Sequence, residues 1–441
     1  MSSQLTQSRI SRRALLQGFA VAGGVTVLAA CTPPQAGGGE AAAPSASGAK
    51  ILARLNGIDP PGQEFVNNFI VDYGAENNVE IEIDYTDWAS SFQKITTGLA
   101  GGTAPDIFMG GGLWTPPIAS KNGALALDDY IATWDDWEDW YQATRDDVTY
   151  NGTIYAVPYR MNARGNIIYR KSKFEEAGLD PAKPPATWEE AKEMAAQLTK
   201  QTDGKYETAG WNVIMAVNDL TQQYEDALYQ AGGNYFSEDR TQPLNNTPEG
   251  EAALQFWVSF IEDGIVPPEG MDSGVPNLNA YSADKIALFA GWPQDMLNTK
   301  LNAPEIWEDT LVGPPLTHKE QAYQVYVDKY FVYSGTKVPD EAAALVRGFM
   351  SGDAAIMIGV EGIWGLPCRK AQESAPIYQD PRMQVFLSNT QYGRPRQIVT
   401  QHFDVQPAMG REVEAAVRGA KTVQQALADM DDAVTKILQG G

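Results

Sequence analysis

Residues 79–85 alternate strictly between apolar and polar side chains, which is the pattern of a strand with one buried face. Apolar residues at helical spacing precede this strand over residues 63–77. A second helical pattern follows it over residues 89–100, where two glycines end the helix. Short apolar runs at residues 51–56 and 106–109 predict further strands. This alternation of strands and helices predicts a parallel sheet with helices on its faces.

The remainder of the chain continues the mixture of strands and helices. Thr187 with Glu190, and Thr422 with Gln425, have the spacing of capping boxes, and they open helices that run to about residues 200 and 438. Thr247, followed by a proline, opens another helix that runs to residue 262. The pattern also predicts strands at residues 152–157, 166–169, 286–289 and 323–333, and a helix at residues 340–350.

The first thirty residues have the pattern of an export signal. Arg9, Arg12 and Arg13 precede an apolar stretch, residues 14–30, which is too short and too weakly apolar for a good spanning helix. The sequence SRRALLQ at residues 11–17 resembles a twin-arginine export signal. The alternative is an ordinary secretory signal that happens to contain two adjacent arginines.

The segment after this signal predicts a membrane anchor. The sequence LAAC, which ends at Cys31, looks like a lipobox, in which the cysteine is lipidated and becomes the first mature residue. The alternative is a chance cysteine at a signal-peptidase site. Residues 32–49 are rich in Ala, Gly, Pro and Ser, so they predict a flexible tether. Cys368 would then have no disulfide partner, and we expect it to be a small buried residue. We therefore expect an exported protein held at the outer face of the cytoplasmic membrane by lipid alone.

Charge and composition exclude several kinds of partner. The 441 residues carry a formal net charge of −23 at pH 7, whereas binding to nucleic acid needs a basic surface. With only two cysteines and two histidines in the chain, we do not expect a Cys/His metal site, which draws on three or four ligands. The acidic run between Asp128 and Asp139 lacks the spacing and the glycine of a calcium loop, and it favours a solvated helix face. We expect no metal ion, no cofactor and no nucleic-acid partner.

The sequence also lacks the common enzyme motifs. It has no phosphate-binding loop, no His-Glu-x-x-His pair and no Gly-x-Ser-x-Gly elbow. Their absence favours a protein that is not an enzyme. A cell-surface carbohydrate-active enzyme remains an alternative, because the two carboxylates of a glycosidase come together in space and not in sequence.

Tryptophan is abundant, and its placement indicates a ligand. Of the 11 tryptophans, five lie in predicted loops, and the last three of these are directly beside glycine or proline: Trp88, Trp114, Trp211, Trp292 and Trp364. Aromatic faces suit the C–H faces of sugar rings, while neighbouring polar side chains bind the hydroxyl groups. Packing in the core is the alternative for each of them. Six other tryptophans fall in helix-like segments and are predicted to be structural: Trp134, Trp137, Trp140, Trp188, Trp257 and Trp307.

An ordered set of motifs resembles the extracellular solute-binding proteins of sugar-type ABC importers, which are similar to maltose-binding protein. The resemblance covers nearly all of the chain after the tether. Its motifs are SFQKITTGLAGGTAPDI at residues 91–107, GALALDDY at 123–130, IYAVP at 154–158, IYRKSKFEEAGL at 168–179, TWEE at 187–190, KIALFAGW at 285–292 and GLPCR at 365–369.

The resemblance implies two α/β lobes joined by hinge strands, with a ligand cleft between them. The implied divisions are a signal at residues 1–30, a linker at 31–49, an N-terminal lobe at 50–160 plus 316–362, and a C-terminal lobe at 161–315 plus 363–441. The chain would cross between the lobes near residues 158–164, 309–315 and 361–367. Such a protein is a monomer that captures a mono- or oligosaccharide and delivers it to the permease subunits of the importer. A glycerophosphodiester, a polyamine or a peptide is the alternative ligand.

The same resemblance, together with the position of strand ends, gives the candidate ligand-binding residues. Trp292 matches a Gly-Trp position after a strand, and Asp59 follows the first strand at the end where open α/β sheets hold ligands. The remaining candidates are Trp114, Tyr159, Arg160, Asn162 and Trp364, with Trp88, Trp211 and Tyr224 as weaker ones. For a phosphate-bearing ligand, the obvious cations are Arg160 and Arg164.

Overall fold

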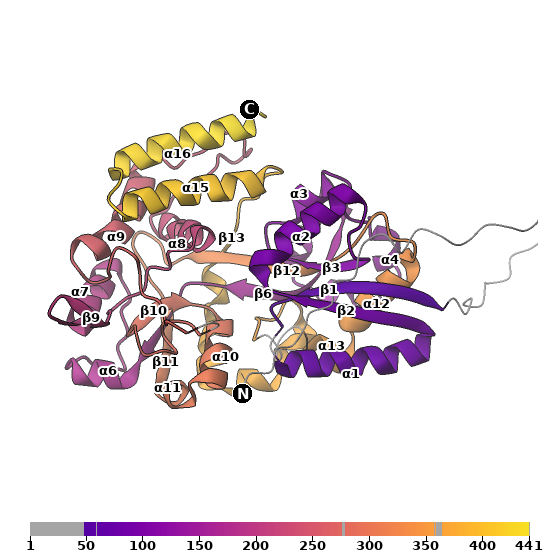
Figure 1. Ribbon diagram of the computed structural model, residues 1–441, viewed down its shortest axis with the longest axis horizontal. Helices are drawn as coiled ribbons and strands as arrows, with labels where there is room; N and C mark the ends of the chain where they lie inside the picture. The colour runs from indigo at the N-terminus through magenta and orange to yellow at the C-terminus, as the bar shows by residue number, and fades with distance from the viewer. Residues whose placement is uncertain (1–47, 59, 276–277, 357, 359–363, 441) are drawn as a thin grey trace, which may run out of the picture. The chain divides into compact units, whose positions relative to one another are not determined.

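The computed structural model describes residues 48–58, 60–275, 278–356, 358 and 364–440 (Figure 1). The predicted signal, most of the predicted tether, Cys31 and Asp59 lie outside these residues. No helix in the described part of the chain is long and apolar enough to cross a membrane.

The larger sheet has the strand order β13-β12-β3-β1-β2, and β6 also pairs with β12. Its strands are β1 (Ala49–Asn56), β2 (Val79–Thr86), β3 (Ile107–Gly110), β6 (Ala156–Ala163), β12 (Tyr323–Val332) and β13 (Gly393–Pro395). β1 is parallel to both β2 and β3, which confirms the parallel sheet predicted from the first strands and helices. β12 runs antiparallel to β3 and β6.

Helices pack against this sheet, and the side chains between the helices and the sheet form its core. They are α1 (Pro60–Asn77), α2 (Trp88–Gly101), α3 (Thr115–Ala119), α4 (Asp128–Ile131), α5 (Gln142–Asp147), α12 (Pro339–Phe349) and α13 (Gly352–Ile356), with a 3-10 helix η1 (Trp137–Asp139) and the hairpin β4 (Thr149–Tyr150)–β5 (Thr153–Ile154). The carboxylate of Asp87 accepts a hydrogen bond from the Ser90 N–H at 2.7 Å and so begins α2. Gly102 ends the same helix with φ of 67°, a conformation that favours glycine.

The smaller sheet has β7 (Asn166–Arg170) at its centre, antiparallel to β10 (Leu288–Gly291) and β11 (Thr310–Pro315). The elements around it are α6 (Lys171–Glu176), α7 (Trp188–Leu198), α8 (Val217–Gln230), α9 (Pro248–Glu262), α10 (Pro293–Asn302), α11 (Pro304–Glu308), α14 (Pro381–Ser388), α15 (His402–Val417), α16 (Val423–Leu438), the hairpin β8 (Lys200–Thr202)–β9 (Lys205–Thr208), and the 3-10 helices η3 (Lys370–Ser374), η4 (Pro376–Gln379) and η5 (Asn389–Tyr392). The capping box that opens α7 is present with both of its hydrogen bonds.

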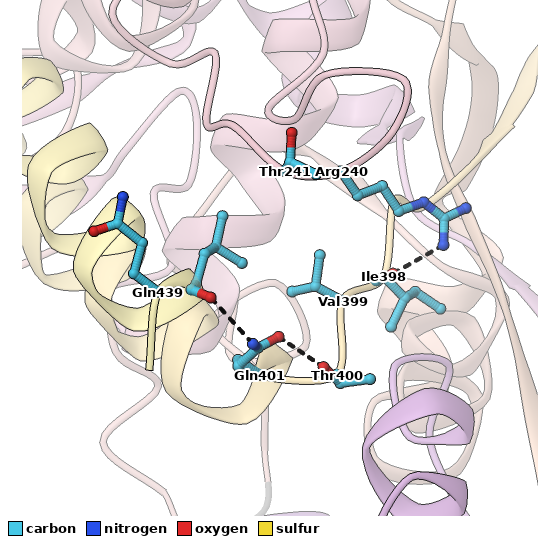
Figure 2. Close-up of a pocket in the computed structure, with 8 residues that line it drawn as sticks. Arg240, Thr241, Ile398, Val399, Thr400, Gln401 and Gln439 are labelled. Atoms are coloured by element: carbon cyan, nitrogen blue, oxygen red, sulfur yellow. Dashed lines mark hydrogen bonds between the residues drawn. The ribbon is translucent and has the colours of Figure 1, made fainter. Parts of the chain in front are cut away.

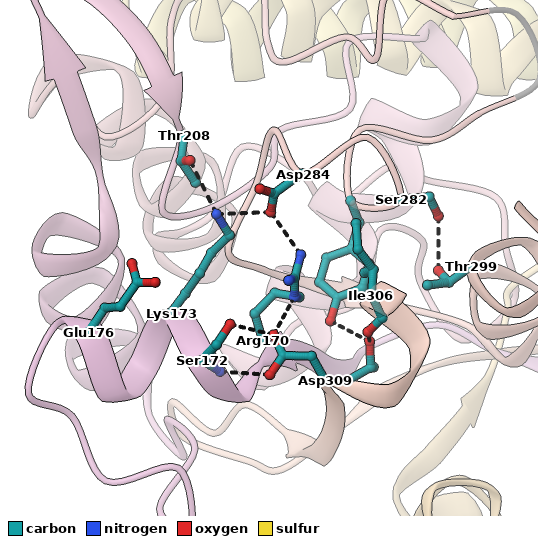
Figure 3. A network of polar contacts seen from close by, with 12 residues as sticks. Arg170, Ser172, Lys173, Glu176, Thr208, Ser282, Asp284, Thr299, Ile306 and Asp309 are labelled. Carbon is teal, nitrogen blue, oxygen red and sulfur yellow. Dashed lines mark hydrogen bonds and ion pairs between the residues drawn. The ribbon is translucent and has the colours of Figure 1, made fainter. Parts of the chain in front are cut away.

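A polar network fastens α6 to the smaller sheet (Figure 3). Asp309, just before β11, lies 2.7 Å from Nε of Arg170 and accepts a hydrogen bond from the Ser172 N–H at 2.9 Å. Asp284 pairs with Arg170 at 2.7 Å and with Lys173 at 2.9 Å. These contacts join the end of β7 to the segments before β10 and β11, so they serve the architecture of the sheet.

The strands that connect the two sheets are β6 and β12, which lie between the two groups of helices in Figure 1. Val332, at the end of β12, lies in the core of the larger sheet, whereas Tyr323, at its start, packs in a cluster with Ile168 of β7. Residues 309–315, predicted as a crossing, instead form β11 and the residue before it, and among the described strands β11 pairs with β7 alone. The third predicted crossing falls partly on residues 361–363, outside the described residues.

Cys368 is fully buried, as predicted. Its thiol Sγ lies 3.1 Å from Oε1 of Gln372 and 3.4 Å from the carbonyl oxygen of Pro158. Burial raises the pKa of the Cys368 thiol far above its usual range. The side chain therefore remains protonated and packs as a small apolar group.

Candidate functional site

Two glycines, Gly111 and Gly112, follow β3 and allow aromatic rings to approach the backbone. A Cβ atom on Gly111 would lie 3.4 Å from Nε1 of Trp114 and 3.8 Å from Cζ3 of Trp88. A Cβ atom on Gly112 would lie only 2.3 Å from Cβ of Tyr326, which is closer than atoms can pack. The loop therefore brings two predicted site residues, Trp88 and Trp114, together beside Tyr326.

Trp292, the residue directly before α10, reaches the same region. Its ring centroid lies 6.1 Å from that of Tyr326, and the two rings meet edge to face at 89°. Its backbone N–H donates to Oδ2 of Asp295 at 3.1 Å, which fixes the start of α10. One residue into the helix, Nε2 of Gln294 donates to the carbonyl oxygen of Gly57 at 3.2 Å.

Gly57 links this contact to Trp88. It has φ of 60°, and a Cβ atom there would lie 2.4 Å from Nε1 of Trp88, so both the backbone and the ring require glycine. The first turn of α10 thus meets the loop after β1 next to Trp88. We call Trp88, Trp114, Trp292 and Tyr326 the aromatic group.

A polar row continues from the aromatic group along β6 and β12. In the pairing of these strands, Tyr326 lies opposite Asn162 and Asp328 lies opposite Arg160. Because alternate residues of a strand share a face, these four side chains lie on one face of the pair. Oδ2 of Asp328 accepts from Nε of Arg160 at 2.8 Å and from Nδ2 of Asn162 at 2.6 Å. All three of these polar side chains are buried.

The other predicted site residues lie apart from the aromatic group. Tyr159 packs on Tyr330, with ring centroids 4.8 Å apart, on the opposite face of β6 from Arg160. Tyr224 is fully buried in the core around α8. Trp364 is buried against Trp307. Their packing accounts for their positions, and their contact with a ligand stays a prediction.

Trp211 is buried against Trp257 and Phe260 but also lines a small cavity. The cavity has a volume of about 10 Å³, and Arg164 and Asp226 also line it. Arg164 therefore connects Trp211 to the aromatic group, because its guanidinium carbon lies 4.8 Å from the centroid of the Trp292 ring.

Two carboxyl groups near Arg164 have shifted pKa values. Burial raises the pKa of Asp295 to about 6, while the hydrogen bond from the Trp292 N–H and the charge of Arg164 act in the opposite direction. Burial likewise raises the pKa of Asp226 to about 7, against the hydrogen bond from the Gln324 N–H and the charge of Arg164. The ionised form of both groups is therefore costly in the folded protein.

The residues missed from the sequence come mainly from β12. Tyr326 and Asp328 lie within a stretch that the pattern identified only as a strand. A usable signal was present, because Asp328 and Lys329 are adjacent charges inside an apolar strand, and both are buried. Asp219 and Asp295 carry no comparable signal, since each lies in the first turn of a helix, where acidic residues are common.

A wider cavity, of about 280 Å³, lies at the end of α16 and contains none of the predicted residues (Figure 2). Nη1 of Arg240 donates to the carbonyl oxygen of Ile398 at 2.9 Å across one side of it. Its other lining groups are mostly aliphatic or amide side chains. Within the described ranges, no group of three or more His, Cys, Asp or Glu side chains could hold a metal ion.

Residues 68–385 match the family of bacterial extracellular solute-binding proteins, and the chain belongs to this family. The protein is therefore of an exported class whose members bind solutes.

Known relatives and structures agree with this assignment. A protein described as a binding protein in Brucella abortus (strain 2308) is 28% identical over 273 residues, which are 61% of this chain and 64% of the relative. The chain thus spans less than two thirds of that relative's length. The mannitol-binding protein of Pseudomonas aeruginosa is 30% identical over 182 residues, 40% of this chain and 37% of that protein.

Among solved structures, the solute-binding protein of an ABC transporter from Thermotoga lettingae, bound to alpha-D-tagatose, has a TM-score of 0.79 at 21% identity. The match covers 88% of this chain and 100% of that one. It confirms the predicted fold class, a two-lobed α/β periplasmic-binding-protein fold.

Proposed function

We propose that this protein captures a carbohydrate, a mono- or oligosaccharide, and delivers it to the permease subunits of an ABC importer. The observation that carries the proposal is the aromatic group, in which three tryptophans and Tyr326 gather beside the buried polar row of Arg160, Asn162 and Asp328. The names of the mannitol-binding relative and of the tagatose-bound structure support the same class of ligand.

The chemistry of the two parts suits a sugar. One face of a pyranose ring presents C–H groups, which pack on aromatic rings, and its edge presents hydroxyl groups, which need directed hydrogen bonds. Oδ2 of Asp328 is held by Arg160 and Asn162, so the polar row is oriented before a ligand arrives. A rigid site of this kind loses little conformational freedom on binding.

The membrane attachment belongs to the same proposal. Lipid on Cys31 would hold the protein at the outer face of the cytoplasmic membrane, and the tether after it would let the folded part reach a permease. We propose that the protein acts as a monomer, with no enzymatic step, and that it is exported through a twin-arginine signal.

A thermal-shift screen of the purified protein tests the ligand class, because a ligand that binds only the folded state raises the melting temperature by mass action. We expect a rise with at least one mono- or oligosaccharide. Glycerophosphocholine, spermidine and short peptides form the comparison set, and a rise with one of these alone would assign the site to a non-sugar solute. Release of shorter sugars from labelled oligosaccharides would instead show an enzyme.

A further inference from the structure

Arg164, directly after β6, connects the aromatic group to a single carboxylate. Its Nη1 donates to Oδ1 of Asp219 at 2.8 Å, and its guanidinium group lies over the ring of Trp292. The Arg164 side chain is only 1% exposed, whereas that of Asp219 is 29% exposed. The arginine is therefore a buried cation with one fixed partner.

Two N–H donor groups of the Arg164 guanidinium take no part in the contact with Asp219. Nε and Nη2 of Arg164 have no acceptor among the residues that the structure describes, and neither has Nε1 of Trp211 in the same small cavity. Buried donors are almost always satisfied, because an unmet donor costs more than a hydrogen bond gains. An oxygen atom from outside the described residues is needed here, and Trp292, a candidate ligand-stacking residue, lies against the same guanidinium.

The charges around Arg164 restrict what can supply that oxygen. Asp219 already neutralises the guanidinium, and the charge of Arg164 also acts on Asp226 and Asp295, so three carboxyl groups lie around one cation. The other buried Arg and Lys side chains in the described ranges are each paired with a carboxylate, among them Arg160 with Asp328, Lys329 with Asp147 and Arg396 with Glu225. An anionic ligand at Arg164 would meet a cation that Asp219 already neutralises, and it would also face Asp219 and Asp295.

We propose that Arg164, held by Asp219, is a ligand-binding residue that donates to hydroxyl or ring oxygens, and that this pair makes the site select uncharged carbohydrates over uronates and sugar phosphates. This inference rests on the proposed function and narrows its substrate class. It adds Arg164 as a hydrogen-bond donor that acts beside Trp292. One part of the ligand stacks on the Trp292 ring, while oxygen atoms at the edge of the ligand accept hydrogen bonds from the guanidinium group.

Titration calorimetry with matched neutral and anionic probes tests the selection. The probes are galactobiose with digalacturonate, and D-mannitol with D-mannitol 1-phosphate, each measured on the wild-type protein. We expect binding of at least one neutral probe and affinity for its anionic counterpart weaker by about tenfold or more. An anionic probe that binds as tightly as its neutral counterpart overturns this inference and leaves the proposed function intact. Absence of binding by every carbohydrate, charged or not, overturns both.

The variant Asp219→Asn then tests the pair itself. Its amide preserves the shape of the side chain but leaves the charge of Arg164 uncompensated, so the anionic probe should gain about tenfold in affinity while the neutral probe does not gain. The matched control is Asp284→Asn, which takes a carboxylate from Arg170 in the network of Figure 3 and should leave both affinities unchanged. Unchanged affinities in Asp219→Asn, with a normal melting temperature, would show that Arg164 serves only the architecture.

Discussion

Asp328 lies directly opposite Arg160 in the pairing of β6 and β12, and one of its oxygens, Oδ2, is 2.8 Å from both Nε and Nη2 of that arginine. Both side chains are at most 3% exposed. This buried pair lies on β6 and β12, the two strands that connect the sheets. The polar row of the site is therefore part of the connection between the two sheets.

Removal of one charge from this pair should destabilise the protein strongly. Asp328→Asn leaves Arg160 as a buried charge without its carboxylate, and loss of one partner of a buried pair costs about 3–5 kcal/mol. Denaturant unfolding followed by circular dichroism measures the change. Asp284→Asn, whose carboxylate is half exposed, is the control and should cost about 0–1 kcal/mol. Equal losses in the two variants would contradict the role given to the buried pair.

Trp292→Ala should weaken carbohydrate binding more than it weakens the fold. The ring is only half buried, and loss of an aromatic stacking surface should reduce affinity by about one to three decades. Calorimetric titration on the variant measures this. Trp188→Ala is the comparison, because Trp188 is buried and stacks on Phe256 at 4.5 Å, and its loss should lower stability by about 3–5 kcal/mol. Normal affinity in Trp292→Ala would remove Trp292 from the site.

Gly112→Ala should disturb the aromatic group through a single methyl group. The new Cβ atom would lie 2.3 Å from Cβ of Tyr326, so the loop or the strand must move, at a cost of about 1–3 kcal/mol. A melting curve and a ligand titration should both show the loss. Gly101→Ala, near the end of α2, meets only Thr103 at 3.6 Å and should be tolerated. The interpretation fails if both alanine variants behave alike.

The pH dependence of stability should contain a contribution from Asp295. Burial raises its pKa from 3.8 to about 6 in the folded state, so the folded protein holds the proton more tightly than the unfolded chain does. Its contribution to stability is therefore fully present below about pH 4 and is lost as the pH rises through 6. Asp295→Asn should flatten the dependence in that window, as measured by urea unfolding at several pH values.

Asp226→Asn provides the contrast for this experiment. The pKa of Asp226 is raised in the same direction, to about 7, so its removal should flatten the dependence up to a higher pH. Unchanged slopes in both variants would show that the two carboxyl groups are ionised as freely in the folded protein as in the unfolded chain.

Cys31→Ser should release the protein from membranes. If the proposed anchor is correct, loss of the thiol would remove the site of lipid attachment, and the predicted tether would keep the folded part independent of the anchor. Cell fractionation in high salt, followed by immunoblotting, measures the distribution. Cys368→Ser changes the other cysteine and should leave the protein in the membrane fraction. Persistence of the Cys31→Ser protein with membranes would show that the lipobox interpretation is wrong.

Elements with strong local signals were predictable from the sequence. The alternation at residues 79–85 gives β2, and Thr247 with its following proline gives α9 with its observed bounds, Pro248–Glu262. α8 was not predictable in this way, because it buries polar residues such as Gln223, Glu225 and Asp226. Their partners, including Arg396 and the N–H of Gln324, come from distant parts of the chain, so no local pattern marks the helix as a core element.

The site residues, like the elements of the fold, were predictable only where the sequence carried a local signal. The placement of tryptophans in predicted loops indicated Trp88, Trp114 and Trp292, which the structure brings into one region. The sequence could not separate Tyr159 from Arg160 by residue type, although the alternation of β6 places their side chains on opposite faces. Arg164 and Asp219 are 55 residues apart, and their pairing depends on how α8 packs against the end of β6.

The buried thiol of Cys368 has a consequence for the environment in which the protein works. Outside the cytoplasm, thiols are exposed to oxidants, yet this sulfur is sealed among Pro158, Gln372 and the core and remains protonated. The folded part can therefore reach its native state without an oxidative folding catalyst, and it should tolerate reducing and oxidising conditions equally. A cysteine introduced on its surface would be the single reactive thiol of the described chain, ready to carry a reporter dye.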